Sequence, residues 1–200
     1  MVIRTYSIQL FKALVSLSDP ADPHALSRIA APELLNLPKS GKSAGPDHRV
    51  ALYSMLALLT PASGVSSIIV ESTTALFPKE PHEGATACLA NALPSHVAFL
   101  LHEGTLPTGT IQFIAKEMGS SKPAVRKAFI GLAGAVFLSE KNILETDNGL
   151  SFAKGLFPSF ENCLKTVTAS PINSPGGPYE GYVAVSVLLG SMAKSKDFGK

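Results

Sequence analysis

The sequence has no tryptophan, only two cysteines and few charges. Charged residues make up 16% of the chain and apolar residues 46%, whereas an average soluble domain is about 25% charged. A chain this apolar can build a core, which excludes disorder as its general state. Seventeen basic residues against 15 acidic ones give a net charge of +2, too small a field to indicate a nucleic-acid binder. We therefore expect no direct binding to DNA.

The cysteines and histidines do not form metal-binding or disulfide patterns. Cys88 and Cys163 are far apart and belong to no CxxC pair, which is typical of reduced thiols in a cytosolic or nuclear protein. We predict that both are small core residues in a cytoplasmic protein. The five histidines include no HExxH motif, so we expect neither a metal nor a cofactor. His96 falls on an apolar stripe and is predicted to be a core histidine.

The sequence also lacks a convincing secretory signal or membrane-spanning helix. Arg4 and Lys12 interrupt the apolar N-terminal stretch, which argues against a secretory signal and leaves a mitochondrial presequence as the alternative. The uncharged stretch 50–70 is long enough to cross a bilayer. Thr60–Gly64 divides it, however, so we predict two short buried helices and no contact with a membrane.

Strict alternation of apolar and polar residues is absent, while apolar residues recur at steps of three and four. One predicted stripe consists of Val125, Phe129, Leu132 and Val136. Another consists of Leu150, Ala153, Phe157, Phe160, Leu164 and Val167. The fold class is therefore predicted to be all-α.

Regular Pro, Gly and Ser breaks divide the helices into about five antiparallel hairpins. The expected helices pair as 4–18 with 24–36, 48–59 with 64–77, 82–102 with 109–118, and 122–139 with 149–169, followed by 179–194. The repeat of roughly 40 residues is that of HEAT and armadillo arrays. We predict that residues 1–200 form a single HEAT/armadillo-like α-solenoid segment, with a compact helical bundle as the alternative.

Particular residues define the expected helix ends. Pro123 suits a first helical turn, where its missing N–H leaves no acceptor unpaired. Ser121 and Asp147 are predicted N-caps. Pro94 and Pro158 fall inside predicted helices and should bend them.

The first and last predicted helices lack a polar outer face. The end repeats of an array need such a face to stay soluble. We therefore expect the chain to be a piece of a longer array, or to pair end to end with another body.

No motif in the chain indicates catalysis. Gly41, Lys42 and Ser43 resemble the end of a phosphate-binding loop, but Asn36 occupies the position of its first glycine. No nucleophile elbow or Cys–His pattern is present. The acid pairs Glu80/Glu83 and Glu140/Glu145 fall in loops or at helix ends, and we interpret them as solvated or as making a favourable contact with a helix dipole. We therefore expect a non-enzyme, with a helical enzyme that uses an unrecognised acid pair as the alternative.

Basic residues suggest a second hypothesis, a ridge that contacts phosphate backbones. Its members are Lys122, Arg126, Lys127, Lys141 and Lys154, with Lys39, Lys42 and Arg49. The competing interpretation, which we favour, is that these are solvated backs of helices among interspersed acids. We expect Arg126 to tie neighbouring repeats together through its planar donors.

Three runs carry a family resemblance: Lys122–Phe137, Phe152–Leu164 and Glu180–Leu189. In the order and spacing of their helices they resemble the N-terminal HEAT-repeat region of the general-control translational activator family. The resemblance is best over 46–194 and weakest over 1–37. It does not mark any individual contact, so no binding residue is assigned.

The resemblance implies a non-catalytic, cytoplasmic scaffold in translational control. Members of that family bind ribosomes together with an ATP-binding-cassette partner. They support activation of the kinase of initiation factor two alpha in amino-acid starvation, and the kinase is bound by other parts of the full-length protein. The alternative function is a HEAT-repeat adaptor for nuclear transport or a phosphatase-type scaffold, because one fold serves many functions.

Overall fold

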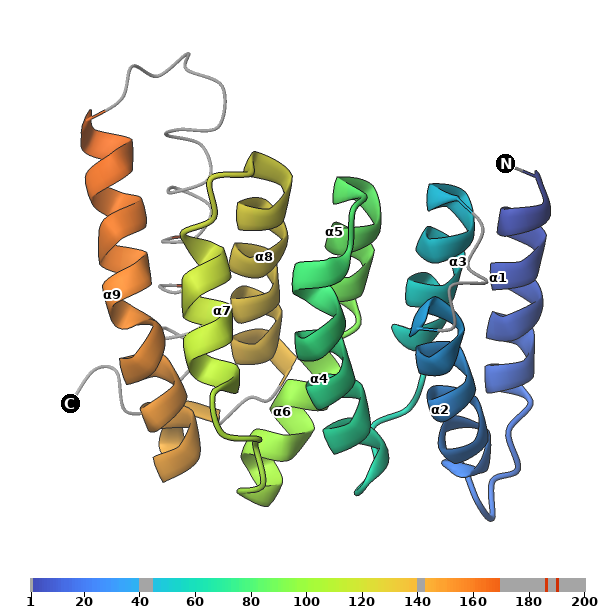
Figure 1. The fold of residues 1–200 in the computed structure, drawn as a ribbon. Helices are drawn as coiled ribbons and strands as arrows, with labels where there is room; N and C mark the ends of the chain where they lie inside the picture. The colour runs from blue at the N-terminus through green and yellow to red at the C-terminus, as the bar shows by residue number, and fades with distance from the viewer. Residues whose placement is uncertain (1, 40–44, 140–142, 170–185, 187–189, 191–200) are drawn as a thin grey trace. The chain divides into compact units, whose positions relative to one another are not determined.

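The computed structural model describes residues 2–39, 45–139, 143–169, 186 and 190, and every regular element in them is helical (Figure 1). The all-α prediction is therefore confirmed. The predicted helix 179–194 lies outside these ranges, apart from two isolated positions. The chain divides into two compact units, Met1–Leu100 and Leu101–Lys200, which are described separately.

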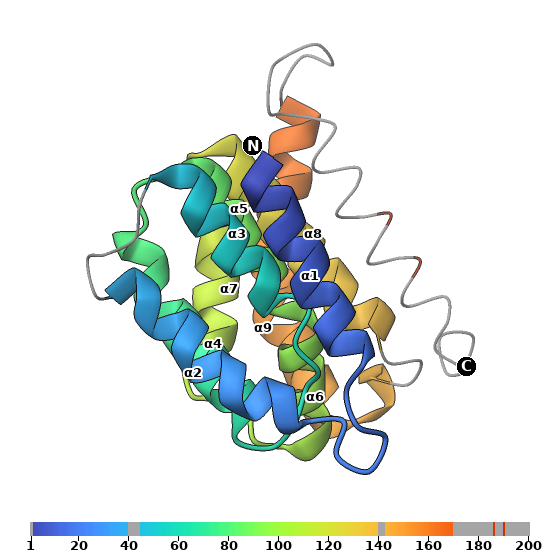
Figure 2. The ribbon, with the colours of Figure 1, turned by 90° about the vertical axis from the view of Figure 1, so that its right-hand side faces the viewer.

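The first unit is built from stacked helical hairpins. Its α-helices are α1 (Val2–Ser16), α2 (Ala25–Lys39), α3 (Pro46–Leu56), α4 (Val65–Leu76), α5 (Glu83–Asn91) and the start of α6 (Pro94–Glu103), and the 3-10 turn η1 (Phe77–Lys79) follows α4. Helix α3 contacts α1 on one side and α5 on the other, while α2 contacts α4. Figure 2 shows α1 and α3 in one row with α2 and α4 in a second. Contact between alternate helices is the packing of a stacked α-solenoid.

Proline and glycine set several helix starts in this unit. Pro46 begins α3, where no helical acceptor awaits its missing amide. Asp47 follows in the first turn, where its charge suits the helix dipole. Gly64 precedes α4 with a φ of 78°, a left-handed conformation that favours glycine. The stretch 50–70 is thus two short helices, as predicted.

Pro94 produces a difference from the sequence expectation. The single predicted helix 82–102 is two helices, α5 and α6, and Pro94 begins α6 rather than bending a continuous helix. Pro94 has no amide to donate to the Ala90 carbonyl. The amide of Leu93 instead donates to Ala90 at 3.1 Å, and that of Val97 to Leu93 at 2.8 Å.

The segment Glu83–Glu103 is long and apolar enough to cross a membrane by length and composition alone. It is 61% buried within the protein, and Ala92 and Leu93 interrupt its helix. Leu89, Leu93 and Val97 in this segment have no exposed surface. A core helical segment explains these features.

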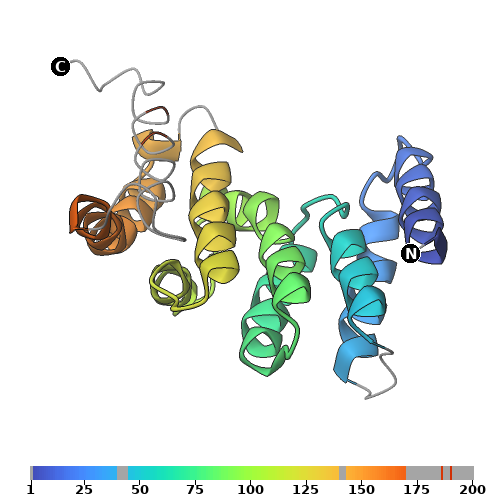
Figure 3. The ribbon, with the colours of Figure 1, turned by 90° about the horizontal axis from the view of Figure 1, so that it is seen from above.

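The described part of the second unit contains α7 (Thr110–Met118), α8 (Pro123–Ser139) and α9 (Asp147–Ala169), with the short turn η2 (Ile143–Glu145). Helix α7 contacts both α8 and α9, and the group is seen from above in Figure 3. Phe113 packs edge-on against Phe129, with ring centroids 5.4 Å apart. Phe137 packs similarly against Phe152 at 5.5 Å, so aromatic pairs connect the three helices.

The inner face of α8 is the predicted one, since Val125, Phe129, Leu132 and Val136 are all buried. The predicted inner face of α9 is wrong for Leu150 and Phe157, while Phe160, which belonged to the predicted row, is buried. Leu150 and Phe157 are 41% and 61% exposed, whereas Phe152, Leu156 and Phe160 form the buried row. Both rows are apolar at helical spacing, so periodicity alone cannot choose between them.

The cap of α9 also differs from its prediction. Thr146, rather than Asp147, accepts the Gly149 amide through its hydroxyl at 3.0 Å. Asp147 is instead the first helical residue. Pro158 lies inside α9 as predicted, and Pro123 begins α8.

Candidate functional site

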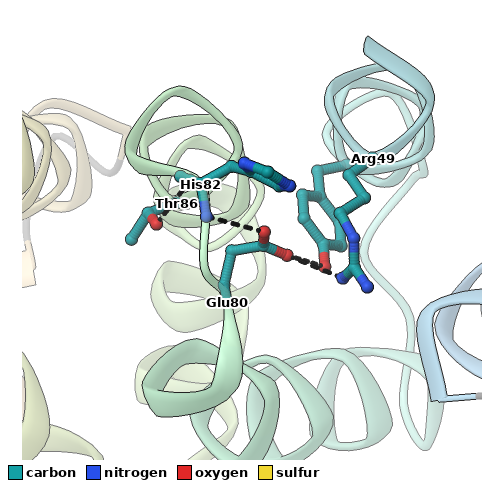
Figure 4. A network of polar contacts seen from close by, with 5 residues as sticks. Arg49, Glu80, His82 and Thr86 are labelled. Carbon is teal, nitrogen blue, oxygen red and sulfur yellow. Dashed lines mark hydrogen bonds and ion pairs between the residues drawn. The ribbon is translucent and has the colours of Figure 1, made fainter. Parts of the chain in front are cut away.

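A network of polar contacts in the first unit joins α3 to the chain just before α5 (Figure 4). Arg49 and Tyr53 lie one turn apart on α3 and therefore share a face of the helix. Arg49 Nη1 donates to Glu80 Oε2 at 3.0 Å. The Tyr53 hydroxyl donates to the same oxygen at 2.7 Å.

The second carboxylate oxygen of Glu80 connects the cluster to α5. Oε1 accepts the His82 amide at 3.2 Å. The His82 carbonyl in turn accepts the Thr86 hydroxyl at 2.9 Å, within the first turn of α5 (Figure 4). Both oxygens of one carboxylate are therefore used to fix α5 against α3.

Burial and the negative charge of Glu80 shift the pKa values of Tyr53 and Arg49. Burial raises the pKa of Tyr53, and the hydrogen bond to Glu80 and the negative charge of Glu80 raise it further. Partial burial acts to lower the pKa of Arg49, but the Glu80 charge and the hydrogen bonds outweigh it, so the net direction is upward. Tyr53 thus stays a neutral donor and Arg49 a cation.

The cluster is closed to a substrate. The Glu80 side chain is 1% exposed and that of Arg49 is 19% exposed, while Tyr53 has no exposed surface. The interpretation of Glu80 as a solvated acid is therefore wrong. A carboxylate this buried is stable only when it is paired and hydrogen-bonded, and Arg49, Tyr53 and the His82 amide supply those contacts.

A second buried polar pair consists of Ser66 on α4 and His96 on α6. Ser66 Oγ lies 3.0 Å from His96 Nδ1 and accepts the Ala62 amide at 3.2 Å. Neither residue has exposed surface, and His96 Nε2 has no hydrogen-bond partner. Burial lowers the pKa of His96 to about 4. His96 is thus the core histidine that the sequence predicts, and its neutral imidazole is enclosed away from any substrate.

The basic ridge is only partly supported. Arg49 is not available to it, because it is paired with Glu80. Lys42 and Lys141 lie outside the described residues, as do Gly41, Ser43 and Glu140, and nothing is described of the Lys39 side chain. In the second unit the Lys122, Lys127 and Lys154 side chains are exposed, as solvated backs of helices are.

Arg126 makes a local contact with the connection before its own helix, and the predicted tie between neighbouring repeats stays a prediction. Arg126 Nη1 donates to the Ser120 carbonyl at 2.7 Å, in the connection between α7 and α8. This connection separates the third predicted hairpin from the fourth. The contact holds the first turns of α8 to that connection.

The cysteines are free, as predicted, but neither belongs to the core. Cys88 on α5 and Cys163 on α9 are both half-buried. Their spacing alone gave no information about which side of each helix faces inward.

A family model described as the General control nonderepressible 1 (Gcn1) N-terminal region matches residues 46–200. The match begins at the first residue of α3 and includes the Arg49–Glu80 cluster and the whole second unit. No curated protein and no solved structure matches the chain.

Proposed function

The chain belongs to the Gcn1 N-terminal family, and we propose that it is a non-catalytic scaffold segment in ribosome-associated translational control. In this role it supports activation of the kinase of initiation factor two alpha during amino-acid starvation. The observation that carries the proposal is the family match over 46–200.

The architecture of the first unit suits a scaffold. Alternate helices contact one another, α1 with α3, α3 with α5, and α2 with α4. We propose that the hairpins are HEAT-type repeats, in which such stacking produces extended binding surfaces. The Arg49–Glu80 cluster fixes the spacing of two stacked helices, α3 and α5.

A non-catalytic role is supported by the state of the two buried polar sites. Catalysis requires a reacting group that a substrate can reach. Glu80 is enclosed by Arg49 and Tyr53, and the Ser66–His96 pair has no exposed surface. Both sites use their polar groups for internal packing.

We propose a cytoplasmic location and two direct partners, the ribosome and an ATP-binding-cassette protein. The kinase is expected to be bound by other parts of the full-length protein. Family membership supports translational-control partners in general, and the exposed Lys122, Lys127 and Lys154 side chains of the second unit suit the phosphate groups of a ribosome.

Affinity purification of the tagged protein from amino-acid-starved cells tests the proposal. We expect ribosomal proteins and an ATP-binding-cassette protein to be enriched over a tag-only control. Enrichment of transport cargo or of a phosphatase catalytic subunit would instead support the alternative adaptor function. Phosphorylation of initiation factor two alpha, measured in the same cells, should fall when residues 46–200 are deleted.

A further inference from the structure

One turn in the middle of α9 lacks a backbone hydrogen bond. Pro158 lies inside the helix, and because proline has no amide hydrogen, the Lys154 carbonyl receives no helical bond from position 158. Gly155 lies in the same turn, and glycine stabilises a helix less than alanine does. We call residues 154–158 the proline turn. It is the turn at which the backbone of α9 resists bending least.

The part of α9 before the proline turn is anchored by its side chains. Phe152 has no exposed surface, and its ring packs against that of Phe137 on α8, with centroids 5.5 Å apart. Asn148 Nδ2 donates to the Leu101 carbonyl at 3.2 Å. The first part of α9 is therefore held by both apolar and polar contacts.

The part of α9 after the proline turn has weaker anchors. Phe160 is 3% exposed, but no later residue of α9 is buried among those whose side chains the structure describes. The ion pair between Lys165 Nζ and Glu161 Oε1, at 2.7 Å, joins α9 only to itself. Ser159 Oγ donates to the Ala115 carbonyl of α7 at 2.9 Å, directly after Pro158.

Helix α7 therefore contacts α9 on both sides of Pro158 (Figure 1). Before it, Gly155 packs so closely on Ile111 that a Cβ at position 155 would lie 2.5 Å from Ile111 Cγ2. One turn later on both helices, the contact is the Ser159–Ala115 hydrogen bond. Water can replace a neutral hydrogen bond of this kind at a small net cost, so the second contact opens more easily than the first.

We propose that the proline turn is a hinge, and that the Ser159–Ala115 hydrogen bond is the latch that holds the second part of α9 against α7. When the latch opens, residues 159–169 move away from α7 while residues 147–154 stay packed. Phe160 leaves its buried position in this motion, so the open form is a minor state, on the order of 1% of molecules. The hinge changes the direction of the helix without separating α7 from α8.

Amide hydrogen exchange, followed by NMR on the whole chain, tests the hinge. Amides of residues 159–163 should exchange about tenfold faster than those of residues 148–156, because they open without unfolding the first part. Ser159→Ala removes the latch and should speed exchange of 159–163 about 3- to 10-fold further, with 148–156 unchanged. Ser151→Ala is the matched control, since Ser151 is exposed on α9 before the proline turn, and it should change neither part.

Pro158→Ala tests the hinge independently of the latch. Alanine supplies the amide that bonds to the Lys154 carbonyl, so residues 159–163 should exchange roughly tenfold more slowly. Pro123→Ala is the control, because Pro123 lies in the first turn of α8, where a missing amide breaks no helical bond. Exchange in α9 should not change in this variant.

The free cysteines provide a second readout in the native chain. Cys163 lies after the proline turn and is half-buried, as is Cys88 on α5. Labelling of Cys163 by a thiol reagent should be faster in Ser159→Ala and slower in Pro158→Ala. Labelling of Cys88 should be the same in both variants.

Three outcomes would overturn the proposal. Equal exchange in the two parts of wild-type α9 would show that the helix has no independent second part. An equal acceleration of both parts in Ser159→Ala would show that α9 opens as a whole. Unchanged exchange of residues 159–163 in Pro158→Ala would show that they fray from the helix end and do not bend at the proline turn.

Discussion

Arg49 Nη1 lies 3.0 Å from Glu80 Oε2, across 31 positions of sequence. The contact joins α3 to the connection between η1 and α5, and the Tyr53 hydroxyl shares the same carboxylate oxygen. One carboxylate therefore determines how two stacked helices meet, and its neutralisation depends on a single guanidinium.

Replacing Arg49 with Met should lower the free energy of unfolding by about 2–4 kcal/mol, because it leaves the Glu80 charge buried without its counter-ion. Urea unfolding followed by circular dichroism measures the effect. Arg28→Met is the matched control. Arg28 pairs with Asp22, but their side chains are 52% and 44% exposed, so its loss should cost under about 1 kcal/mol. Equal losses in the two variants would contradict the role given to Glu80.

His96 should make the stability depend on pH. Its pKa is lowered from 6.5 to about 4 by burial, so the unfolded chain takes up a proton at a higher pH than the folded chain. The stability present above pH 6.5 should therefore fall as the pH drops toward 4 and level off below it. A pKa difference of one unit corresponds to 1.36 kcal/mol, so the difference of about 2.5 units between the unfolded and folded states corresponds to a loss of about 3 kcal/mol in the free energy of unfolding.

The variant His96→Gln provides the comparison, because glutamine does not titrate. The difference in unfolding free energy between pH 7 and pH 5 should be smaller in His96→Gln than in the wild type. His48→Gln, at an exposed position, should retain the wild-type difference. An unchanged pH dependence in His96→Gln would show that other groups cause it.

Gly149 on α9 lies close to the backbone of Ile143 in η2. A Cβ at this position would be 1.7 Å from the Ile143 carbonyl oxygen, so Gly149→Ala must displace η2 from α9. We expect a loss of about 3 kcal/mol in unfolding free energy. Gly131→Ala on α8 is the control, since its Cβ would meet nothing within 4 Å. It should stabilise by about 0.5–1 kcal/mol through helix propensity.

Arg126→Ala should lower the free energy of unfolding by about 1–2 kcal/mol, because it removes the donor to the Ser120 carbonyl. Lys127→Ala, at the next position, removes an exposed side chain and should change it by less than about 0.5 kcal/mol. Thermal unfolding of both variants measures the difference. Intact stability of Arg126→Ala together with lost ribosome association would show that Arg126 is a partner contact instead.

The helices could be predicted because their signals are local. Apolar spacing located α8, and Pro123 located its first turn. Which of the two apolar rows of α9 faces the core is not determined by the sequence of α9 itself. It depends on Phe137, which packs against Phe152, and on Ile143, which leaves room only for a glycine at 149.

The buried cluster could not be predicted for the same reason. The i, i+4 spacing of Arg49 and Tyr53 on α3 was visible, but Glu80 follows a proline-containing turn and resembled a solvated acid. Only the stacking of α5 on α3 brings the carboxylate to them. His96 was easier to place, because it lay on an apolar helical stripe.

Ribosome co-sedimentation tests the central claim, that this segment works at the ribosome, most directly. The purified chain should pellet with ribosomes through a sucrose cushion at moderate salt, and the stable Gly131→Ala variant should pellet equally. In the full-length protein, deletion of residues 46–200 should reduce the pelleted fraction. A folded chain that stays in the supernatant, together with unchanged association of the deleted protein, would contradict the account.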